Sequence, residues 1–230
     1  ITLTGGGSYS LTYGQNEVYY RRSEAANMLV ANPTMDYTQN PNALAQVIKY
    51  DTSDNTAYGI MDMTEVFSHI TYTDKNGEKK PYITKALRGM MLTDNRSRVI
   101  VQDEVTLAQE TDFYWYANTG ANVTFSPDGK SALLDLEGDR MLARIIEAPQ
   151  NATFVVMPKK SVVDGVAHTN TEGPKLAICV PNQSENFTIA VEYIPLGKGE
   201  GIPEKNALVP IANWKAEDNG MTALAHAGSA

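Results

Sequence analysis

The chain has 230 residues, enough for one large all-β domain or two small ones, and 42% of them are hydrophobic, which allows a full core and argues against disorder. Its net charge of −8 argues against non-specific nucleic-acid binding, since that needs a basic surface. No apolar run is as long as a membrane-spanning helix, so we expect no membrane span.

The first ten residues, ITLTGGGSYS, lack the basic and apolar regions of a signal peptide. Either a signal has been removed or the chain is cut from something larger. The glycines at 5–7 are followed by the strand-like SYSLTYG, not by the Lys-Ser/Thr and helix of a phosphate-binding loop. We interpret them as a flexible entry to that strand.

The next segments are ambiguous. PNALAQVI, at 41–48, starts with proline and is apolar at helical spacing, but its end also reads as a strand. MTEVFSHI, at 63–70, allows the same two interpretations. Beyond them, the Asn-Gly pair in DKNG, at 74–77, suits a type I′ turn.

Apolar and polar residues alternate over 98–107, which is typical of a strand with one packed and one solvated face. The packed face has Val99, Val101, Val105 and Leu107, and the solvated face has Arg98, Gln102, Glu104 and Thr106. Asp103 falls on the packed face, where a carboxylate needs a partner, so we predict a nearby arginine rather than a catalytic role. Because neighbouring strand residues face opposite ways, Asp103 and Glu104 cannot form a catalytic pair.

The same alternation recurs twice. In TDFYWYAN, Phe113, Trp115 and Ala117 alternate with Asp112, Tyr114 and Tyr116; in NFTIAVEYI, Phe187, Ile189, Val191 and Tyr193 share a face opposite Thr188 and Glu192. Turn signals such as SPDGKS and LEGD separate the strands at short intervals. The fold class predicted is all-β: an antiparallel β-sandwich of two large sheets with few short helices.

The loop PLGKGEGIPEKN, at 195–206, is the clearest break in this pattern. We therefore predict one sandwich domain over 1–200 and a C-terminal extension over 201–230, packed on the sandwich or frayed.

Chemistry-bearing side chains are sparse. Cys179 lies in an apolar strand-like run and is interpreted as a small buried hydrophobe; as the single cysteine, it cannot form an intramolecular disulfide. The histidines, His69, His168 and His226, lack metal-binding spacing.

Basic residues and tyrosines are the remaining candidates for ligand contact. We expect most of the basic residues to form a solvated face: Arg21, Arg22, Lys79, Lys80, Lys85, Arg88, Lys159 and Lys160. Tyrosines that would stack on sugars if exposed are Tyr13, Tyr19, Tyr20, Tyr114 and Tyr116, although strands favour aromatic residues anyway.

Several stretches, in order from about Ser8 to Leu196, resemble the C-terminal β-sandwich region of the heparinase II/III-like polysaccharide lyases. They are SYSLTYG, YYRRSEAANMLVANP, AYGIMDMTEVF, LRGMMLTDNRSRVIVQDEV, DFYWYANTGANVTF and ALLDLEGDRMLARI. The second is similar to that family's Arg-Ser-Glu-x-His-Asn motif and the apolar strand after it. It is carried here by Arg22, Ser23, Glu24 and Asn27.

The resemblance implies an enzyme in which an α/α toroid joins this sandwich and acidic polysaccharides are cleaved by β-elimination. Much of that catalytic set comes from the toroid, so we expect this chain alone to be inactive, with no catalytic residue and no cofactor. The family tends to have a histidine where this chain has Ala26, and its other usual zinc ligands also lack counterparts, so we predict no metal. The resemblance implies a periplasmic or extracellular location.

Two functions follow from the resemblance. The first is a lyase sandwich that supports the toroid and lines a cleft for an acidic polysaccharide, with Tyr20, Arg21, Arg22 and Asn27 near the sugar. The alternative is a stand-alone, non-catalytic carbohydrate-binding or scaffold module that has lost the catalytic and zinc residues. A β-sandwich of another carbohydrate-active family also stays open, since fold alone does not determine function.

Overall fold

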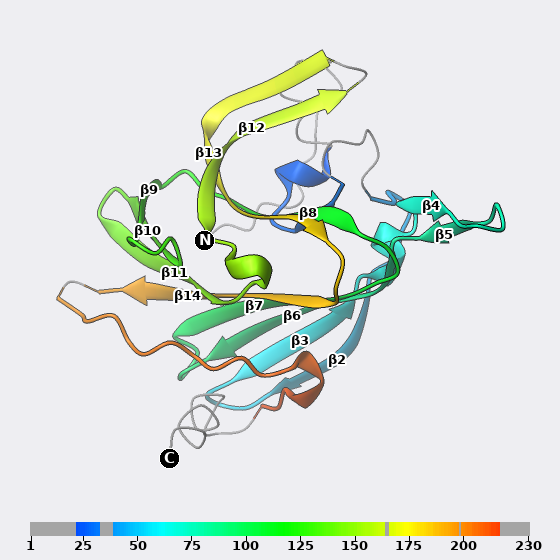
Figure 1. The fold of residues 1–230 in the computed structure, drawn as a ribbon. Coiled ribbons are helices and arrows are strands. Elements are labelled where there is room, and N and C mark those ends of the chain that lie inside the picture. The colour runs from blue at the N-terminus through cyan, green and yellow to red at the C-terminus, as the bar shows by residue number, and fades with distance from the viewer. Residues whose placement is uncertain (1–21, 33–38, 164–165, 198, 217–230) are drawn as a thin grey trace.

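The computed structural model describes residues 22–32, 39–163, 166–197 and 199–216, and it forms an antiparallel β-sandwich as predicted (Figure 1). The small sheet has the order β1 (Leu29–Ala31), β8 (Thr111–Asn118), β13 (Val166–Gln183), β12 (Phe154–Val163). The large sheet has the order β2 (Gln46–Thr52), β3 (Ala57–Asp62), β6 (Ile83–Thr93), β7 (Arg98–Leu107), β14 (Phe187–Leu196), β11 (Asp139–Glu147), β10 (Ser131–Leu136), β9 (Asn122–Phe125).

The remaining elements are short. A hairpin of β4 (Thr71–Thr73) and β5 (Lys79–Pro81) projects from the sandwich, and the 3₁₀ turns are η1 (Ser23–Ala25), η2 (Thr64–Phe67), η3 (Pro149–Asn151) and η4 (Ile211–Asn213). Of the two ambiguous segments, 41–48 leads into strand β2 and 63–70 contains η2. In the described residues, no helix is long and apolar enough to cross a membrane.

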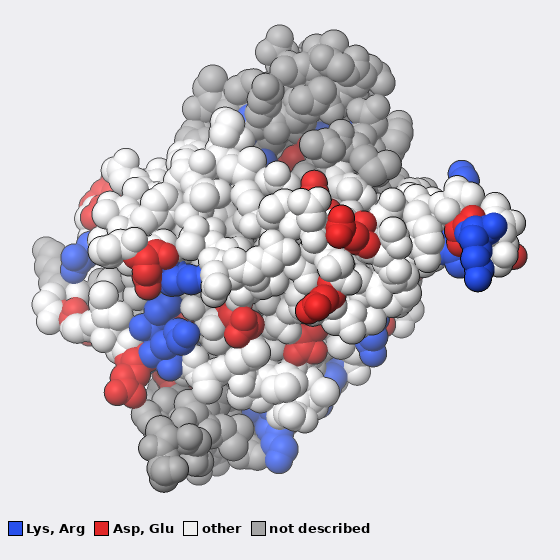
Figure 2. Space-filling model, in the orientation of Figure 1, with Lys and Arg blue, Asp and Glu red and all other residues white. Residues whose placement is uncertain are grey.

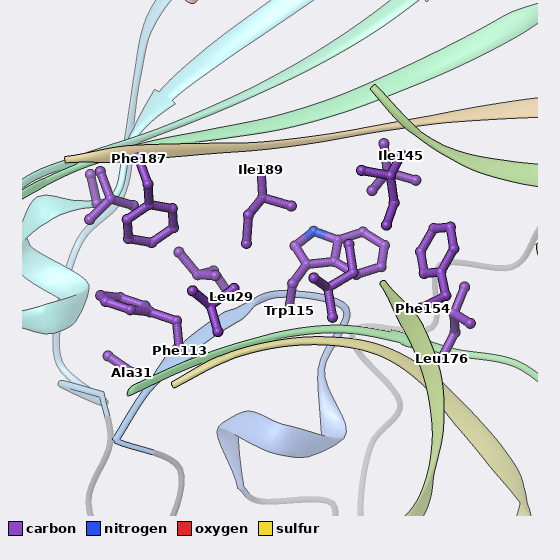
Figure 3. Packing of buried hydrophobic residues seen from close by; sticks show 14 of the residues in the cluster. Leu29, Ala31, Phe113, Trp115, Ile145, Phe154, Leu176, Phe187 and Ile189 are labelled. Carbon is purple, nitrogen blue, oxygen red and sulfur yellow. The ribbon is translucent and has the colours of Figure 1, made fainter. Parts of the chain in front are cut away.

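The main core lies between the two sheets (Figure 3). Phe113 of β8 meets Phe187 of β14 with ring centroids 4.7 Å apart, and Trp115 lies 6.4 Å from Phe154. The inward faces predicted for 111–118 and 187–193 are confirmed, because the predicted inward residues belong to this core. Their outer faces are not fully solvated as expected, since Tyr116 and Glu192 are buried. Each such side chain contributes about 1.5–3 kcal/mol when it is fully buried.

The outer face of the large sheet is covered, so the prediction of a solvated face on β7 was wrong. Residues 203–216, called here the C-terminal strap, cross this face, where Ile100 and Gln102 are both buried (Figure 1). Trp214, with 0% of its surface exposed, anchors the strap in a second apolar cluster. A Cβ atom on Gly89 would lie 2.5 Å from the Trp214 ring, so only glycine permits this close packing.

Two connections between neighbouring strands can be compared with the turn signals in the sequence. Glu137 and Gly138 connect β10 to β11 with φ values of 55° and 96°, the positive pair that a type I′ hairpin needs. The DKNG turn differs from the prediction, because Gly77, at φ 82°, has a positive φ and Asn76 does not. The backbone N–H of Gly77 instead donates to the carbonyl of Asp74 at 3.0 Å, and that of Asp74 donates to the carbonyl of Glu78 at 2.8 Å, closing a longer loop.

Candidate functional site

Residues 22–28, called here the motif segment, pass from η1 into β1 and are held by side chains of both sheets. Arg88 of the large sheet donates from Nη1 to the Asn27 carbonyl at 2.8 Å. At the end of β8 in the small sheet, the Asn118 backbone N–H donates to Asn27 Oδ1 at 2.7 Å. Asn118 Nδ2 donates to the Ala25 carbonyl at 3.0 Å. The motif segment therefore ties the two sheets together.

Beneath this segment, Arg88 and Asp103 form a buried ion pair on facing positions of β6 and β7. Nε and Nη2 of Arg88 donate to the two carboxylate oxygens, each at 2.7 Å. Burial alone would lower the Arg88 pKa, but the charge and hydrogen bonds of Asp103 outweigh burial and raise it. The predicted arginine partner of Asp103 is confirmed, and the expectation that Arg88 belongs to a solvated face was wrong.

Lys175 of β13 supplies a second buried cation. Its Nζ donates to the Glu24 carbonyl at 3.3 Å and lies 3.9 Å from the centroid of the Tyr116 ring. Burial lowers the Lys175 pKa to about 8, although the Glu24 charge works in the opposite direction. Lys175 and Asn118 were missed by the sequence analysis, because strand alternation gives no information about partners distant in sequence.

Tyr116 is buried beneath Lys175, so the idea that it stacks on sugar was wrong. It belongs to a small cluster on the outer face of the small sheet, against which Met28 packs. Tyr114 is half-buried in the same place. Tyr13, Tyr19 and Tyr20 lie outside the described residues.

Two of the four predicted substrate-binding residues can be located. Asn27 is exposed, while its side-chain oxygen accepts from Asn118. The Arg22 side chain is 13% exposed, and its Nε lies 3.8 Å from Oε1 of the buried Glu24. Tyr20 and Arg21 lie outside the described residues. The structure thus brings Arg22 and Asn27 onto one short segment, and their contact with sugar stays a prediction.

The other described basic residues of that set are spread over three strands, and Lys159 lies near Lys175, whose pKa its charge lowers. Lys79 and Lys80 lie on the projecting β4–β5 hairpin, where Lys80 pairs with Glu78 at 2.9 Å (Figure 2). Lys85 is exposed on β6, and Lys159 is half-buried on β12. The side chain of Lys160 and all of Arg21 lie outside what is described.

A groove with a volume of about 740 Å³ lies elsewhere, near the turn into β14. It is lined by Glu104, Glu147, Glu185, Gln150, Gln183 and Asn186, among others. No lysine or arginine is among its described lining residues. Three carboxylates without a cation would repel a polyanion, so this groove does not fit an acidic polysaccharide.

Metal-binding side chains are not clustered in the described part of the chain. There, no group of three His, Cys, Asp or Glu side chains is arranged to hold a metal ion. Ala26 is exposed within the motif segment. Cys179 is half-buried rather than fully buried, its Sγ lies 3.8 Å from Met157 Sδ, and burial raises the pKa of its thiol.

The fold is similar to that of solved heparinases. The heparan sulfate lyase HepC from Pedobacter heparinus matches 81% of this chain with a TM-score of 0.56 and 13% identity. Two heparinase III structures match 83% and 80% of the chain, with TM-scores of 0.57 and 0.51 and identities of 13% and 15%. The sequence matches no protein-family profile and no curated protein.

The similarity covers only part of each heparinase. The chain spans 26% of HepC and 27% and 25% of the two heparinase III structures. At these identities the match establishes a heparinase-like β-sandwich fold, and it does not carry the activity of the whole enzymes to this chain.

Proposed function

We propose that this chain is the β-sandwich domain of a heparinase-like polysaccharide lyase. In this role it supports an α/α toroid and lines one side of a cleft for an acidic polysaccharide. The observation that carries the proposal is the match itself, because it covers about four-fifths of this chain and about a quarter of HepC. A domain that is one part of a larger enzyme has these proportions.

Cleavage of a uronate-containing polymer by β-elimination needs a base for the proton beside the carboxylate. It also needs cations or hydrogen-bond donors that neutralise the carboxylate. We assign the donor role to the motif segment and its N-terminal neighbours: Tyr20, Arg21, Arg22 and Asn27. An arginine suits this role because its guanidinium binds carboxylate or sulfate groups in a bidentate manner. The base belongs to the toroid, so the chain alone is inactive.

The location proposed for the protein is periplasmic or extracellular. Glycosaminoglycans and alginate lie outside cells, and an enzyme that cleaves them meets its substrate there. The test is fractionation of the native host, with detection of the protein in the periplasm or the medium.

The catalytic part of the proposal is tested with heparan sulfate, chondroitin sulfate and alginate. Elimination yields an unsaturated uronate that absorbs in the ultraviolet. We expect no absorbance increase with the 230-residue chain and an increase with the parent protein. Turnover by the isolated chain would contradict the assignment of the base to the toroid. A parent gene without a helical domain upstream would instead support a stand-alone binding module.

The binding part is tested with variants of the parent protein. Arg21→Ala with Arg22→Ala should raise KM for the polysaccharide about tenfold, as expected for the loss of one or two charge-assisted contacts. Arg140→Ala with Lys79→Ala is the matched control, because it also removes two positive charges and both residues are exposed, on β11 and β5. An equal effect of both changes would mean that only net charge matters. No effect of either would remove the motif segment from the cleft.

A further inference from the structure

Among the described strands, β2 forms one edge of the large sheet (Figure 1). Every residue of β2 is exposed. Val47 is 61% exposed, Ile48 52% and Tyr50 80%. An edge strand presents unpaired backbone groups to solvent, and natural proteins usually protect such an edge with proline or outward-pointing charge. An edge with these apolar side chains is suited to pairing with another strand.

The usual protection is weak here. β2 contains no proline. The Lys49 side chain points back over its own sheet, where Nζ donates to the Trp214 carbonyl at 2.9 Å and lies 5.4 Å from the Tyr58 ring. A bulge between Val47 and Lys49 disturbs only the start of the strand. From Lys49 to Thr52 the strand pairs regularly with β3, so its other edge, with which no described strand pairs, is regular as well.

We propose that β2 pairs in antiparallel register with β2 of a second copy of this chain, about a two-fold axis at Tyr50. With such an axis perpendicular to the sheet, each strand residue meets a residue that lies on the same face. Two residues that meet across this axis are therefore an even number of positions apart, and the axis passes beside the same residue of both strands. The regular stretch after the bulge allows three such registers, with the axis at Lys49, Tyr50 or Asp51.

Charge selects among these three registers. An axis at Lys49 sets lysine against lysine, and an axis at Asp51 sets aspartate against aspartate, and both are unfavourable. An axis at Tyr50 sets Lys49 opposite Asp51 of the second copy, twice by symmetry, and Lys49 Nζ exchanges its contact with the Trp214 carbonyl for that carboxylate. Both side chains lie on the outer face, because Lys49 is opposite Ile60 and Asp51 is opposite Tyr58, which belong to the outer cluster.

The Tyr50 ring would also gain a partner. It stands opposite Gly59, around whose Cβ position no atom lies within 4 Å, so its own sheet offers it little contact. Across the axis the two Tyr50 rings become a cross-strand aromatic pair, a favourable combination. Because only five residues of each copy pair, from Ile48 to Thr52, we expect a reversible dimer of micromolar affinity. This inference does not depend on the proposed function.

The experiment is sedimentation velocity over a concentration series, with two charge variants. Lys49→Asp and Asp51→Lys each create two like-charge contacts, and each should weaken dimerisation about tenfold or more. An equimolar mixture of the two variants should restore the dimer, because every cross-strand pair in that heterodimer is again of opposite charge. Lys79→Asp, on the exposed β5, is the control and should dimerise like the original chain.

Three results would overturn the proposal. The first is a chain that stays monomeric up to high micromolar concentration. The second is a dimer that forms equally well with either charge variant. The third is a mixture of the two variants that fails to associate. Because Lys49→Asp also removes the contact to the Trp214 carbonyl, a thermal melt accompanies each variant. Asp51→Lys keeps that contact, so weaker dimerisation of this variant cannot be caused by loss of the bond to the strap.

Discussion

The motif segment and the C-terminal strap are both irregular stretches held on the sandwich by side chains that donate to their carbonyl groups. Arg88, Lys175 and Asn118 do so for the motif segment. For the strap, Arg144 donates to the carbonyls of Pro203 and Glu204, and Gln102 donates to that of Val209. Both segments are therefore held by the same kind of hydrogen bond, the motif segment by residues of both sheets and the strap by residues of the large sheet.

The two segments differ in what they bury. The strap buries Trp214 and Ile211 in an apolar cluster, whereas the most buried residue of the motif segment is Glu24. The ion pairs beneath the two segments are buried to a similar degree. The Arg88 and Asp103 side chains are 9% and 6% exposed, and those of Arg144 and Glu192 are 13% and 0% exposed. The strap should thus depend on packing, and the motif segment on completed ion pairs and hydrogen bonds.

Trp214→Ala should have the largest effect. It removes the anchor of the strap and leaves a cavity over Gly89, which should lower the free energy of unfolding by about 3–5 kcal/mol. Urea denaturation measures the loss. Leu208→Ala, at a more exposed position of the strap, should cost under about 1 kcal/mol. Equal losses for the two variants would mean that the strap has no single anchor.

Asp103→Ala should have the next largest effect. It should lower the free energy of unfolding by about 3 kcal/mol, because Arg88 then stays buried without its counterion. The double variant Arg88→Met with Asp103→Leu should recover part of this loss, since it removes both charges together. Urea denaturation measures the free energy of unfolding of both variants. If the double variant is less stable than Asp103→Ala, the bond from Arg88 to the Asn27 carbonyl matters more than the ion pair.

Gly89→Ala should destabilise by about 1–3 kcal/mol, because the new methyl group overlaps the Trp214 ring. A red shift of tryptophan fluorescence would report that the strap moves. Gly59→Ala is the matched control on the neighbouring strand, where nothing lies within 4 Å of the added Cβ and φ is not positive. Its effect should be neutral or slightly stabilising. A destabilising Gly59→Ala would contradict this packing argument.

The contrast between the segments also shows what the sequence could reveal. Alternation identified the inward faces of β8 and β14, and it placed Asp103 where only a paired carboxylate is stable. It could not show what covers an outer face. Gln102 was expected in solvent, but the strap covers it, and Tyr116 lies under Lys175. Covering segments come from distant parts of the chain, and no local pattern marks their destination.

The candidate site was predicted only in part for the same reason. The motif itself was visible in the sequence, and its Arg22 and Asn27 lie on either side of the η1 turn. The side chains that hold it, however, come from positions 61 and 91 residues beyond Asn27. Tertiary pairing over such separations is set by the whole sheet order, which composition and periodicity do not encode.

The smallest predicted effect is a pH dependence that originates at the motif segment. The Lys175 pKa is lowered from 10.5 to about 8 in the folded chain, chiefly by burial. Between these pH values the unfolded chain binds one more proton than the folded chain, so this group's contribution to stability increases as pH rises. Below pH 8, Lys175 is protonated in both the folded and the unfolded chain, so the cost of burying its charge no longer changes with pH. Raising the pH from about 8 to about 9 should therefore add about 1 kcal/mol relative to Lys175→Met.

The measurement is urea denaturation at both pH values, with and without Lys175→Met, in a Cys179→Ala background. That background is needed because the raised thiol pKa of Cys179 acts in the opposite direction over the same range. No comparable pH effect is expected from the strap, where Trp214→Ala should lower stability equally at the two pH values. If the Lys175→Met variant keeps the full pH dependence, Lys175 is already solvated in the folded chain. The motif segment would then be held as loosely as a surface loop.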